Sequence, residues 1–244
     1  MSNAPSPLLL WTEQIIRKLK GNSGYLLDRN ISLSNLLEIL RYRGIAYLRG
    51  FWIRWQFYKS SGALFLGKSV TIRHKNQISV GKSIIIEDYV YIDALSQNGI
   101  ILENNVTIAK FTSIQCTGVI QELGVGLKIG NNSAIGAYSF LGAQGGIKIG
   151  TNVIMGPRVN IHSEDHGFQD ATIPIRLQKT TRKGVVIDDN CWIGASSTIL
   201  DGVHIHTGCI VAAGSVVTKD LPPNSIAAGV PARVIKQRGQ ETTK

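Results

Sequence analysis

The sequence predicts an all-β solenoid, a parallel β-helix, that follows an N-terminal helical segment. Three observations predict this fold. An aliphatic residue recurs at every sixth position through most of the chain, and a small residue often stands four places after it. Gly, Asn and Asp gather between the repeats. Residues 8–60 instead carry apolar side chains at steps of three and four, which is the helical period.

A period of six fits neither a simple strand, whose period is two, nor a helix, whose period is 3.6. It fits a short strand followed by a tight corner, so that three units close one triangular coil and stacked coils share a core. We expect the aliphatic residues to point inward. They are Val80, Ile86, Ile92, Leu102, Ile108, Ile114, Ile129, Ile135, Leu141, Ile149, Met155, Ile161, Ile187, Ile193, Ile199, Ile205, Val211 and Val217.

The residue four places after an aliphatic position must share the narrow interior, so bulk is excluded there. These small residues are Ser133, Ser139, Val153, Val159, Cys191, Ser197, Val203, Cys209 and Ser215. The corner segments Gly130–Asn132, Gly150–Asn152 and Asp188–Asn190 suit tight turns and positive φ angles. We therefore predict one continuous core through residues 61–238.

The repeat changes phase at several points, where extra residues must bulge from corners. The largest break lies between Ile161 and Ile187, and it predicts a protruding loop over residues 162–186. This loop is polar and contains His162 and His166. Loops on a rigid scaffold are where functional residues are expected.

The two ends differ from the repeat. Residues 1–60 hold nine basic residues against three acidic ones, interleaved with aromatic residues. This segment is either a cap that packs on the first coil or on a neighbouring subunit, or a basic, aromatic helix at a membrane surface. At the other end, Pro222 and Pro223 are expected to stop the strand ladder, and residues 239–244 to form a disordered tail.

Composition narrows the function classes. The chain has 244 residues, of which 43% are hydrophobic and 17% charged, and this is typical of a globular protein. No apolar run predicts a membrane span, and no signal peptide is evident. Three scattered cysteines predict neither disulfides nor a metal site, which favours a cytoplasmic setting. The net charge of +10 comes without a nucleic-acid-binding motif, so an anionic membrane or a phosphorylated ligand is favoured.

The end of the chain carries a family likeness. The segments Cys191–Ala195, Ala212–Asp220 and Gly229–Ile235 resemble the end of hexapeptide-repeat acetyltransferases. The most similar subgroup comprises the sugar O-acetyltransferases of polysaccharide biosynthesis together with galactoside and maltose acetyltransferases. The likeness covers about residues 64–238.

This resemblance implies a left-handed β-helix, a homotrimer, active sites between subunits, and acetyl-CoA as co-substrate. It implies that His166, in the interrupting loop, is the catalytic residue. It also implies that Ala195 and Ala213 face the pantetheine arm. Thr218, Lys219 and Arg233 match positions near the nucleotide end of the coenzyme. The N-terminal segment differs from that of the galactoside and maltose enzymes, so their acceptor-binding residues are not transferred.

We therefore predict an O-acetyltransferase that modifies a sugar hydroxyl of a surface polysaccharide or its lipid-linked precursor. A histidine titrates near neutrality and can remove the hydroxyl proton during attack on the thioester, and the resemblance implies that His166 has this role. His162 and Asp165 are candidate acceptor-binding residues, and Asp165 or Glu164 could orient the imidazole. Cys191 and Cys209 are read as core residues, and His74, His204 and His206 as surface residues. No metal is expected.

Three alternatives stay open. One is an N-acetyltransferase that acts on an amino sugar nucleotide. Another is a zinc lyase, because γ-type carbonic anhydrases share this solenoid. That enzyme needs three histidines across a subunit interface, and His162 and His166 offer a pair, but no third ligand has an evident place. The third is a scaffold without catalytic activity, which would not bind coenzyme A.

Overall fold

The N-terminal part of the chain is helical, as predicted. The computed structural model describes residues 6–239. The elements here are helix α1 (Pro7–Lys20), helix α2 (Leu33–Ile53) and the single turn η1 (Arg54–Gln56). The Ser6 Oγ accepts a hydrogen bond from the N–H of Leu9, and the Ser32 Oγ accepts one from the N–H of Asn35. These caps satisfy amides that have no partner inside a helix, and so favour helix starts at these residues.

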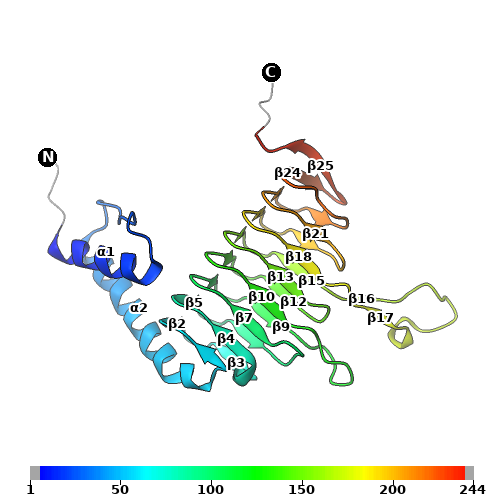
Figure 1. The fold of residues 1–244 in the computed structure, drawn as a ribbon, viewed down its shortest axis with the longest axis horizontal. Helices are drawn as coiled ribbons and strands as arrows, with labels where there is room; N and C mark the ends of the chain where they lie inside the picture. Colours follow the sequence, from blue (N-terminus) through cyan, green and yellow to red (C-terminus); the bar gives the residue numbers. More distant parts are fainter. Residues whose placement is uncertain (1–5, 240–244) are drawn as a thin grey trace.

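The remainder winds as stacked triangular coils, each of which adds a strand to three parallel sheets (Figure 1). The first sheet holds β1 (Lys59–Ser60), β4 (Ile78–Val80), β7 (Ile100–Leu102), β10 (Leu127–Ile129), β13 (Ile147–Ile149), β18 (Val185–Ile187) and β21 (His204–Ile205). The second holds β2 (Leu64–Leu66), β5 (Ile84–Ile86), β8 (Thr107–Ile108), β11 (Ala134–Ile135), β14 (Ile154–Met155), β19 (Trp192–Ile193), β22 (Ile210–Val211), β24 (Ser225–Gly229) and β25 (Ala232–Gln237). The third holds β3 (Thr71–Arg73), β6 (Tyr91–Asp93), β9 (Ser113–Gln115), β12 (Phe140–Gly142), β15 (Asn160–His162), β20 (Thr198–Ile199) and β23 (Val216–Val217).

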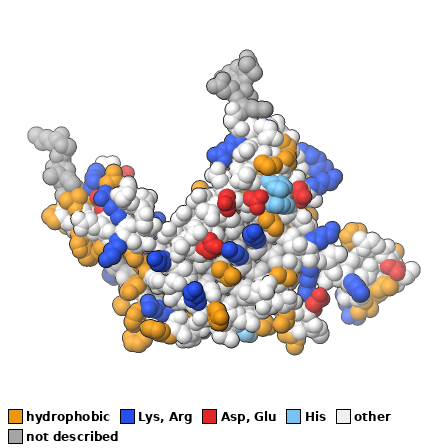
Figure 2. Space-filling model, in the orientation of Figure 1, with side chains coloured by type: hydrophobic (Ala, Val, Ile, Leu, Met, Phe, Trp, Pro, Cys, Tyr) orange, Lys and Arg blue, Asp and Glu red, His pale blue; other side chains and the backbone are white. Residues whose placement is uncertain are grey.

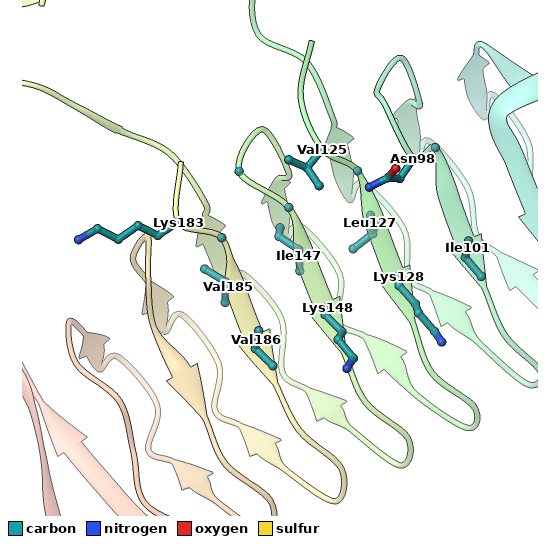
Figure 3. A pocket seen from close by; sticks show the side chains of 15 residues that line it. Asn98, Ile101, Val125, Leu127, Lys128, Ile147, Lys148, Lys183, Val185 and Val186 are labelled. Atoms are coloured by element: carbon teal, nitrogen blue, oxygen red, sulfur yellow. The ribbon is translucent and has the colours of Figure 1, made fainter. Parts of the chain in front are cut away.

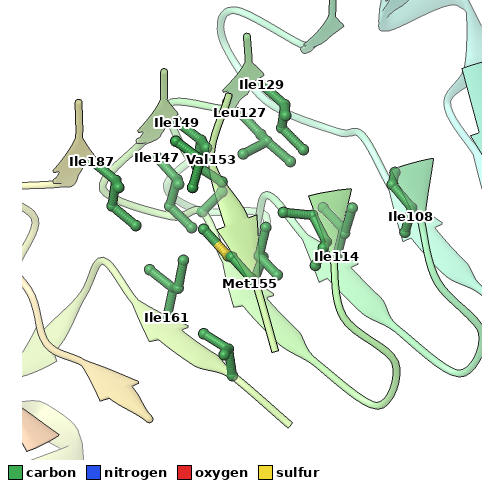
Figure 4. Close-up of a cluster of buried hydrophobic side chains, with 14 of the residues drawn as sticks. Ile108, Ile114, Leu127, Ile129, Ile147, Ile149, Val153, Met155, Ile161 and Ile187 are labelled. Carbon is green, nitrogen blue, oxygen red and sulfur yellow. The ribbon is translucent and has the colours of Figure 1, made fainter. Parts of the chain in front are cut away.

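The interior of the coils matches the predicted pattern. Every aliphatic residue of the six-residue period is buried, and so is every small residue predicted to lie beside it. Figure 4 shows part of this core, where side chains of successive coils, such as Ile129, Ile149 and Ile187, stack on one another. The parallel pairing keeps equivalent residues in register from coil to coil. The prediction of a continuous parallel β-helix core is confirmed.

The first two corners of each coil share one backbone conformation. The first corner joins the first sheet to the second, and there Asn132, Asn152 and Asn190 have φ angles of 58°, 58° and 60°. The second corner joins the second sheet to the third and repeats this left-handed conformation. Asparagine tolerates positive φ better than most residues with a side chain, which explains its recurrence at the first corner.

The second corner also carries an aromatic stack that the repeat does not predict. The rings of Tyr89 and Phe111 lie 4.9 Å apart, and those of Phe111 and Tyr138 lie 4.8 Å apart. All three residues have positive φ. Parallel in-register stacking places equivalent corner residues above one another, so the contact between their rings offsets part of the backbone strain.

Every change of phase in the repeat falls at the third corner, which joins the third sheet to the first sheet of the next coil. The inserted segments there are residues 74–77, 94–99, 116–126, 143–146 and 163–184. The last of these is the predicted protruding loop. It contains β16 (Asp165–His166), the turn η3 (Ile175–Leu177) and β17 (Thr180–Thr181), and it projects far from the coils (Figure 1).

The prediction that Pro222 and Pro223 stop the strand ladder was wrong. After them, β24 joins the second sheet, where it pairs in parallel with β22, and β25 turns back antiparallel to β24. The prolines lie between β23 and β24, so no ladder position loses a donor N–H. Of the predicted tail, only Gly239 is described, and residues 240–244 lie outside the described part of the chain.

Helix α2 packs on the start of the solenoid through a narrow face. Leu36, Ala46 and Gly50 are buried, and a Cβ atom on Gly50 would lie 2.0 Å from the carbonyl oxygen of Leu64 in β2. The backbone of the helix therefore touches the sheet directly. The helical period is confirmed, but most of the apolar residues that define it point away from the solenoid.

Candidate active site

The predicted catalytic residue, His166, lies on an arm that the third corner extends into solvent. Strand β16 pairs antiparallel with β17, with His166 opposite Thr180, and the N–H of Gly167 donates to the carbonyl oxygen of Lys179 at 3.0 Å. The His166 side chain is exposed, and neither ring nitrogen has a hydrogen-bond partner within residues 6–239. Both ring nitrogens are therefore open to contact with a ligand.

The base of the arm is fixed by hydrogen bonds of the buried Ser163 and by ion pairs of Arg182. The Ser163 Oγ donates to the carbonyl oxygen of Gly142 at 2.8 Å and accepts from the N–H of Gly145 at 2.9 Å. Arg182 forms ion pairs with Glu164 and with Glu122, the second at 3.3 Å. The arm is thus tied to the neighbouring inserted segment 116–126. Sequence reasoning missed this anchor, since nothing in the repeat pairs the two segments.

The candidate acceptor residues stand near this base. The carboxylate of Glu164 is committed to Arg182 and is not a partner of His166. Asp165 is exposed and adjacent to His166 in β16, and side chains of successive strand residues point to opposite faces. His162 ends β15 on the outer face of the third sheet, with its ring centroid 5.4 Å from that of Phe140.

The residues predicted to face coenzyme A lie at the second corner. Ala195 and Ala213 occupy equivalent places in successive coils, because the N–H of Gly214 donates to the carbonyl oxygen of Ala195 at 2.8 Å. Ala195 is half-buried and Ala213 is exposed. The N–H groups of both alanines have no acceptor in the described part of the chain. Two stacked free amides are suited to hydrogen-bond the carbonyl oxygens of an extended ligand.

The three residues predicted near the nucleotide end gather at the C-terminal coils. Thr218 and Lys219 follow β23 and are exposed. Arg233 is exposed on β25, and its guanidinium donates to the carbonyl oxygen of Ala232 at 2.9 Å. Basic side chains at an exposed edge suit phosphate groups.

Within one chain the structure does not bring His166 together with Ala195 and Ala213. The alanines lie at the second corner, before the strands of the third sheet begin, whereas the arm leaves from the far end of β15 in that sheet. The length of a strand of the third sheet therefore separates the second corner from the third. A strand spans about 3.3 Å per residue, so this separation is well beyond the length of a hydrogen bond.

A groove of about 470 Å³ lies on the first sheet, beside the end of the arm (Figure 3). Ile101, Val125 and Val186 give it an apolar lining, and Lys128, Lys148 and Lys183 add positive charge. None of the predicted site residues lines this groove. We give it no catalytic role, because no imidazole or thiol is among the residues that line it.

A cluster of two histidines and one aspartate lies on the outer face of the first sheet. The Nε2 of His204 lies 2.9 Å from the Oδ2 of Asp188, and the Nδ1 of His206 lies 3.5 Å from the same oxygen. Two imidazoles and a carboxylate are donors that zinc accepts. Within residues 6–239 this is the one group of three close metal-type donors, and it contains neither His162 nor His166. The zinc-lyase alternative, which rested on those two histidines, gains no support.

The prediction of surface histidines missed this cluster. His204 and His206 stand two residues apart on one strand face, and Asp188 lies one coil earlier. Seeing the three together requires the register between coils. His74 likewise pairs with a carboxylate, that of Asp93, at 2.8 Å.

Cys191 and Cys209 are core residues, as predicted, and Cys116 is one too. Cys116, Cys191 and Cys209 are buried and free. Burial raises the pKa of the Cys116 thiol to about 12 and that of Cys191 to about 11. A nucleophilic cysteine needs a lowered pKa, so these thiols are suited to packing.

Comparison with known proteins supports the repeat. The model described as bacterial transferase hexapeptide (six repeats) matches residues 184–219, and the model described as hexapeptide repeat of succinyl-transferase matches residues 126–156. The putative lipopolysaccharide biosynthesis O-acetyl transferase WbbJ of Escherichia coli is 30% identical over 119 residues, which are 46% of this chain and 61% of that protein. Galactoside O-acetyltransferase of E. coli is 38% identical over 94 residues, which are 37% of this chain and 44% of that protein.

The chain thus spans less than two thirds of the length of these curated relatives. A crystal structure of a mutant of AntD, an N-acyltransferase from Bacillus cereus in complex with dTDP and coenzyme A, superimposes with a TM-score of 0.52 at 23% identity. The match covers 79% of this chain and 90% of that chain. At this identity the likeness concerns the fold. With the hexapeptide repeat and three parallel sheets, it identifies a left-handed β-helix with N-terminal helices.

Proposed function

We propose that this chain, which belongs to the hexapeptide-repeat acetyltransferase family, transfers an acetyl group from acetyl-CoA to a carbohydrate hydroxyl with His166 as general base. Two separate observations carry the proposal: His166 presents an exposed imidazole on an anchored arm, and Ala195 and Ala213 present free backbone amides at the positions that match the coenzyme site. The names of WbbJ and of galactoside O-acetyltransferase support a sugar hydroxyl as the acceptor.

The separation within one chain supports a site shared between subunits. Because the third sheet lies between His166 and the two alanines, one subunit alone offers only half of the site. In a homotrimer related by threefold symmetry, the arm of one subunit can reach the second corner of its neighbour. The exposed Trp192 and Ile154, on adjacent strands of the second sheet, give that neighbour an apolar contact surface.

The reaction needs no covalent enzyme intermediate. The imidazole of His166 takes the proton of the acceptor hydroxyl as its oxygen attacks the thioester carbonyl carbon. The tetrahedral oxyanion then collapses and the C–S bond breaks. The thiolate of coenzyme A receives the proton from the imidazolium, and the acetyl ester leaves with the acceptor. The free N–H groups of Ala195 and Ala213 hold the pantetheine arm, and Lys219 and Arg233 pair with phosphates at the nucleotide end.

An amino group could replace the hydroxyl in the same geometry, since the base removes a proton in either reaction. An N-acetyltransferase of an amino sugar nucleotide is therefore the alternative. The identity of the acceptor separates the two proposals.

We also propose that the chain acts in the cytoplasm at the inner face of the membrane, which suits a lipid-linked acceptor.

The test is acceptor-dependent release of coenzyme A thiol, measured with a panel of sugars, amino sugars and their nucleotide derivatives. We expect His166→Ala to lower the turnover by about 10²–10⁴-fold, the usual contribution of a general base. Leu177→Ala, an exposed position on the same arm, is the matched control and should stay near wild type. Failure of the wild-type chain to bind acetyl-CoA would overturn the proposal.

A further inference from the structure

Helix α2 has a second apolar face that nothing in the described chain covers. Four residues of this face are Leu33, Leu37, Leu48 and Trp52, with exposed fractions of 55%, 52%, 57% and 74%, and Trp55 follows in η1 with 72%. At 100° per residue the four helical residues fall within roughly 100° of arc, on a side of the helix away from Gly50 and Ala46. The sequence pattern that predicts a helix is thus the pattern of this exposed stripe.

The orientation of the stripe is fixed. Gly50 brings the backbone of α2 against Leu64, and Arg43 reaches Glu87 at 3.9 Å on the same side. The Oη of Tyr42 donates to the Oδ1 of Asp88 at 3.0 Å. Because the helix is held by these contacts, it cannot rotate to bury the stripe against its own solenoid.

By the same helical geometry Arg41 falls within the arc of the stripe and Arg49 next to it, and neither has an ion pair in the described chain. Glu13, one of the three acidic residues of this segment, is buried and pairs with Arg17 and Arg29. Within residues 6–239, six basic residues of the segment have no ion pair. They are Lys18, Lys20, Arg41, Arg49, Arg54 and Lys59. Figure 2 shows basic side chains, in blue, among hydrophobic side chains, in orange, over the helical end of the molecule.

Aromatic rings and positive charge meet where the helix ends. The guanidinium of Arg54 lies 4.8 Å from the Trp55 ring and 5.5 Å from the Phe51 ring. Tyr58, two residues after η1, is 79% exposed. Trp, Tyr and Arg are the residues that favour the boundary between lipid headgroups and acyl chains.

We propose that α2 docks in the plane of a membrane that contains anionic lipids. Its apolar stripe would enter the headgroup region and its basic residues would contact lipid phosphates. A second copy of the chain is a poorer occupant, since it would bring the same unneutralised positive charge to the contact. No helix within residues 6–239 is long and apolar enough to span a bilayer, so the contact is with the surface. Such a contact does not depend on acyl transfer.

The test is flotation of the full chain with vesicles of phosphatidylcholine alone or with one third phosphatidylglycerol, at low and high salt. We expect binding to the anionic vesicles that high salt weakens. Leu48→Gln combined with Trp52→Gln and Trp55→Gln should lower the partition coefficient at least about tenfold. Arg41→Gln with Arg49→Gln should remove the preference for anionic lipid.

Matched controls keep the test sharp. Ile120→Gln with Ile175→Gln changes two exposed apolar residues on inserted segments of the solenoid and should bind like wild type. Every variant lies at the surface, so an unchanged thermal melt shows that each is folded. No flotation of the wild type with anionic vesicles overturns the proposal. Equal flotation of wild type and the stripe variant overturns it too. So does a wild type that self-associates through the stripe, as shown by loss of self-association in the stripe variant, and binds no vesicles.

Discussion

The first two corners of each coil keep the six-residue spacing, whereas the third corner carries every inserted segment, from residues 74–77 to residues 163–184. At the first two corners the chain passes between sheets with a single left-handed residue, as at Asn152. At the third corner it can leave the coil, form an arm and return in register. The regular coils therefore stabilise the fold, whereas the segments inserted at the third corner can carry functional residues.

The largest effect should come from removing the arm. If residues 164–183 are replaced by a short turn like the one that joins Ile199 to Ile205, the coils should still stack. Acceptor-dependent turnover should be lost, because His166 is gone, while the melting temperature changes little. Activity assays and thermal melts on the same preparation measure both. Turnover that survives the deletion would place the chemistry elsewhere and erase the contrast between the corners.

The interior should respond in the opposite way. Ile193→Ala removes a fully buried side chain and leaves a cavity between rigid coils, so the free energy of unfolding should fall by about 2–5 kcal/mol. Ile175→Ala, the same change on the arm at 58% exposure, should cost under about 0.5 kcal/mol. Denaturant unfolding of both variants gives the comparison. Equal costs would mean that the arm contributes to the core.

A tight corner should be sensitive to backbone conformation alone. Asn152 has a φ of 58°, and its side chain is exposed. Asn152→Val forces a β-branched residue into the left-handed region and should cost about 1–2 kcal/mol, whereas Asn152→Gly should be near neutral. A valine variant as stable as the glycine variant would show that this corner relaxes.

The smallest effect concerns the thiols. Since burial raises the pKa values of Cys116 and Cys191 to about 12 and about 11, both stay protonated in the folded chain at pH 8. A thiol reagent should therefore label native protein slowly and denatured protein at all three cysteines. Their contribution to stability is complete below the pKa of an unfolded thiol and declines as the pH rises above it. Rapid labelling of the native chain would contradict a closed interior.

The solenoid could be predicted because its period is a direct consequence of space. The six-residue period places both Ile193 and Ser197 inside the coil, so their burial follows from the sequence. The common placement of all inserted segments at the third corner needed the assignment of each strand to a sheet. The anchor between Arg182 and Glu122 joins residues 60 positions apart and has no signature in the repeat.

The helical end shows where pattern reasoning stops. The steps from Leu33 to Leu37 and from Leu48 to Trp52 predict a helix, but they do not say which face packs. Gly50 decides it, because only a residue without a side chain permits the approach to Leu64. Asp188 and His204 gave no signal either, since they meet only through the register of parallel strands.

The most direct test of a shared active site is complementation between two inactive variants. His166→Ala spoils the arm, and Ala213→Trp blocks the exposed second corner. The two variants are produced together with different tags and purified through both. If each site combines the arm of one subunit with the corner of its neighbour, every mixed trimer keeps one intact site out of three and should show about a third of wild-type turnover. If the mixed oligomers are as inactive as either variant alone, each site lies within one chain, and the proposed arrangement is wrong.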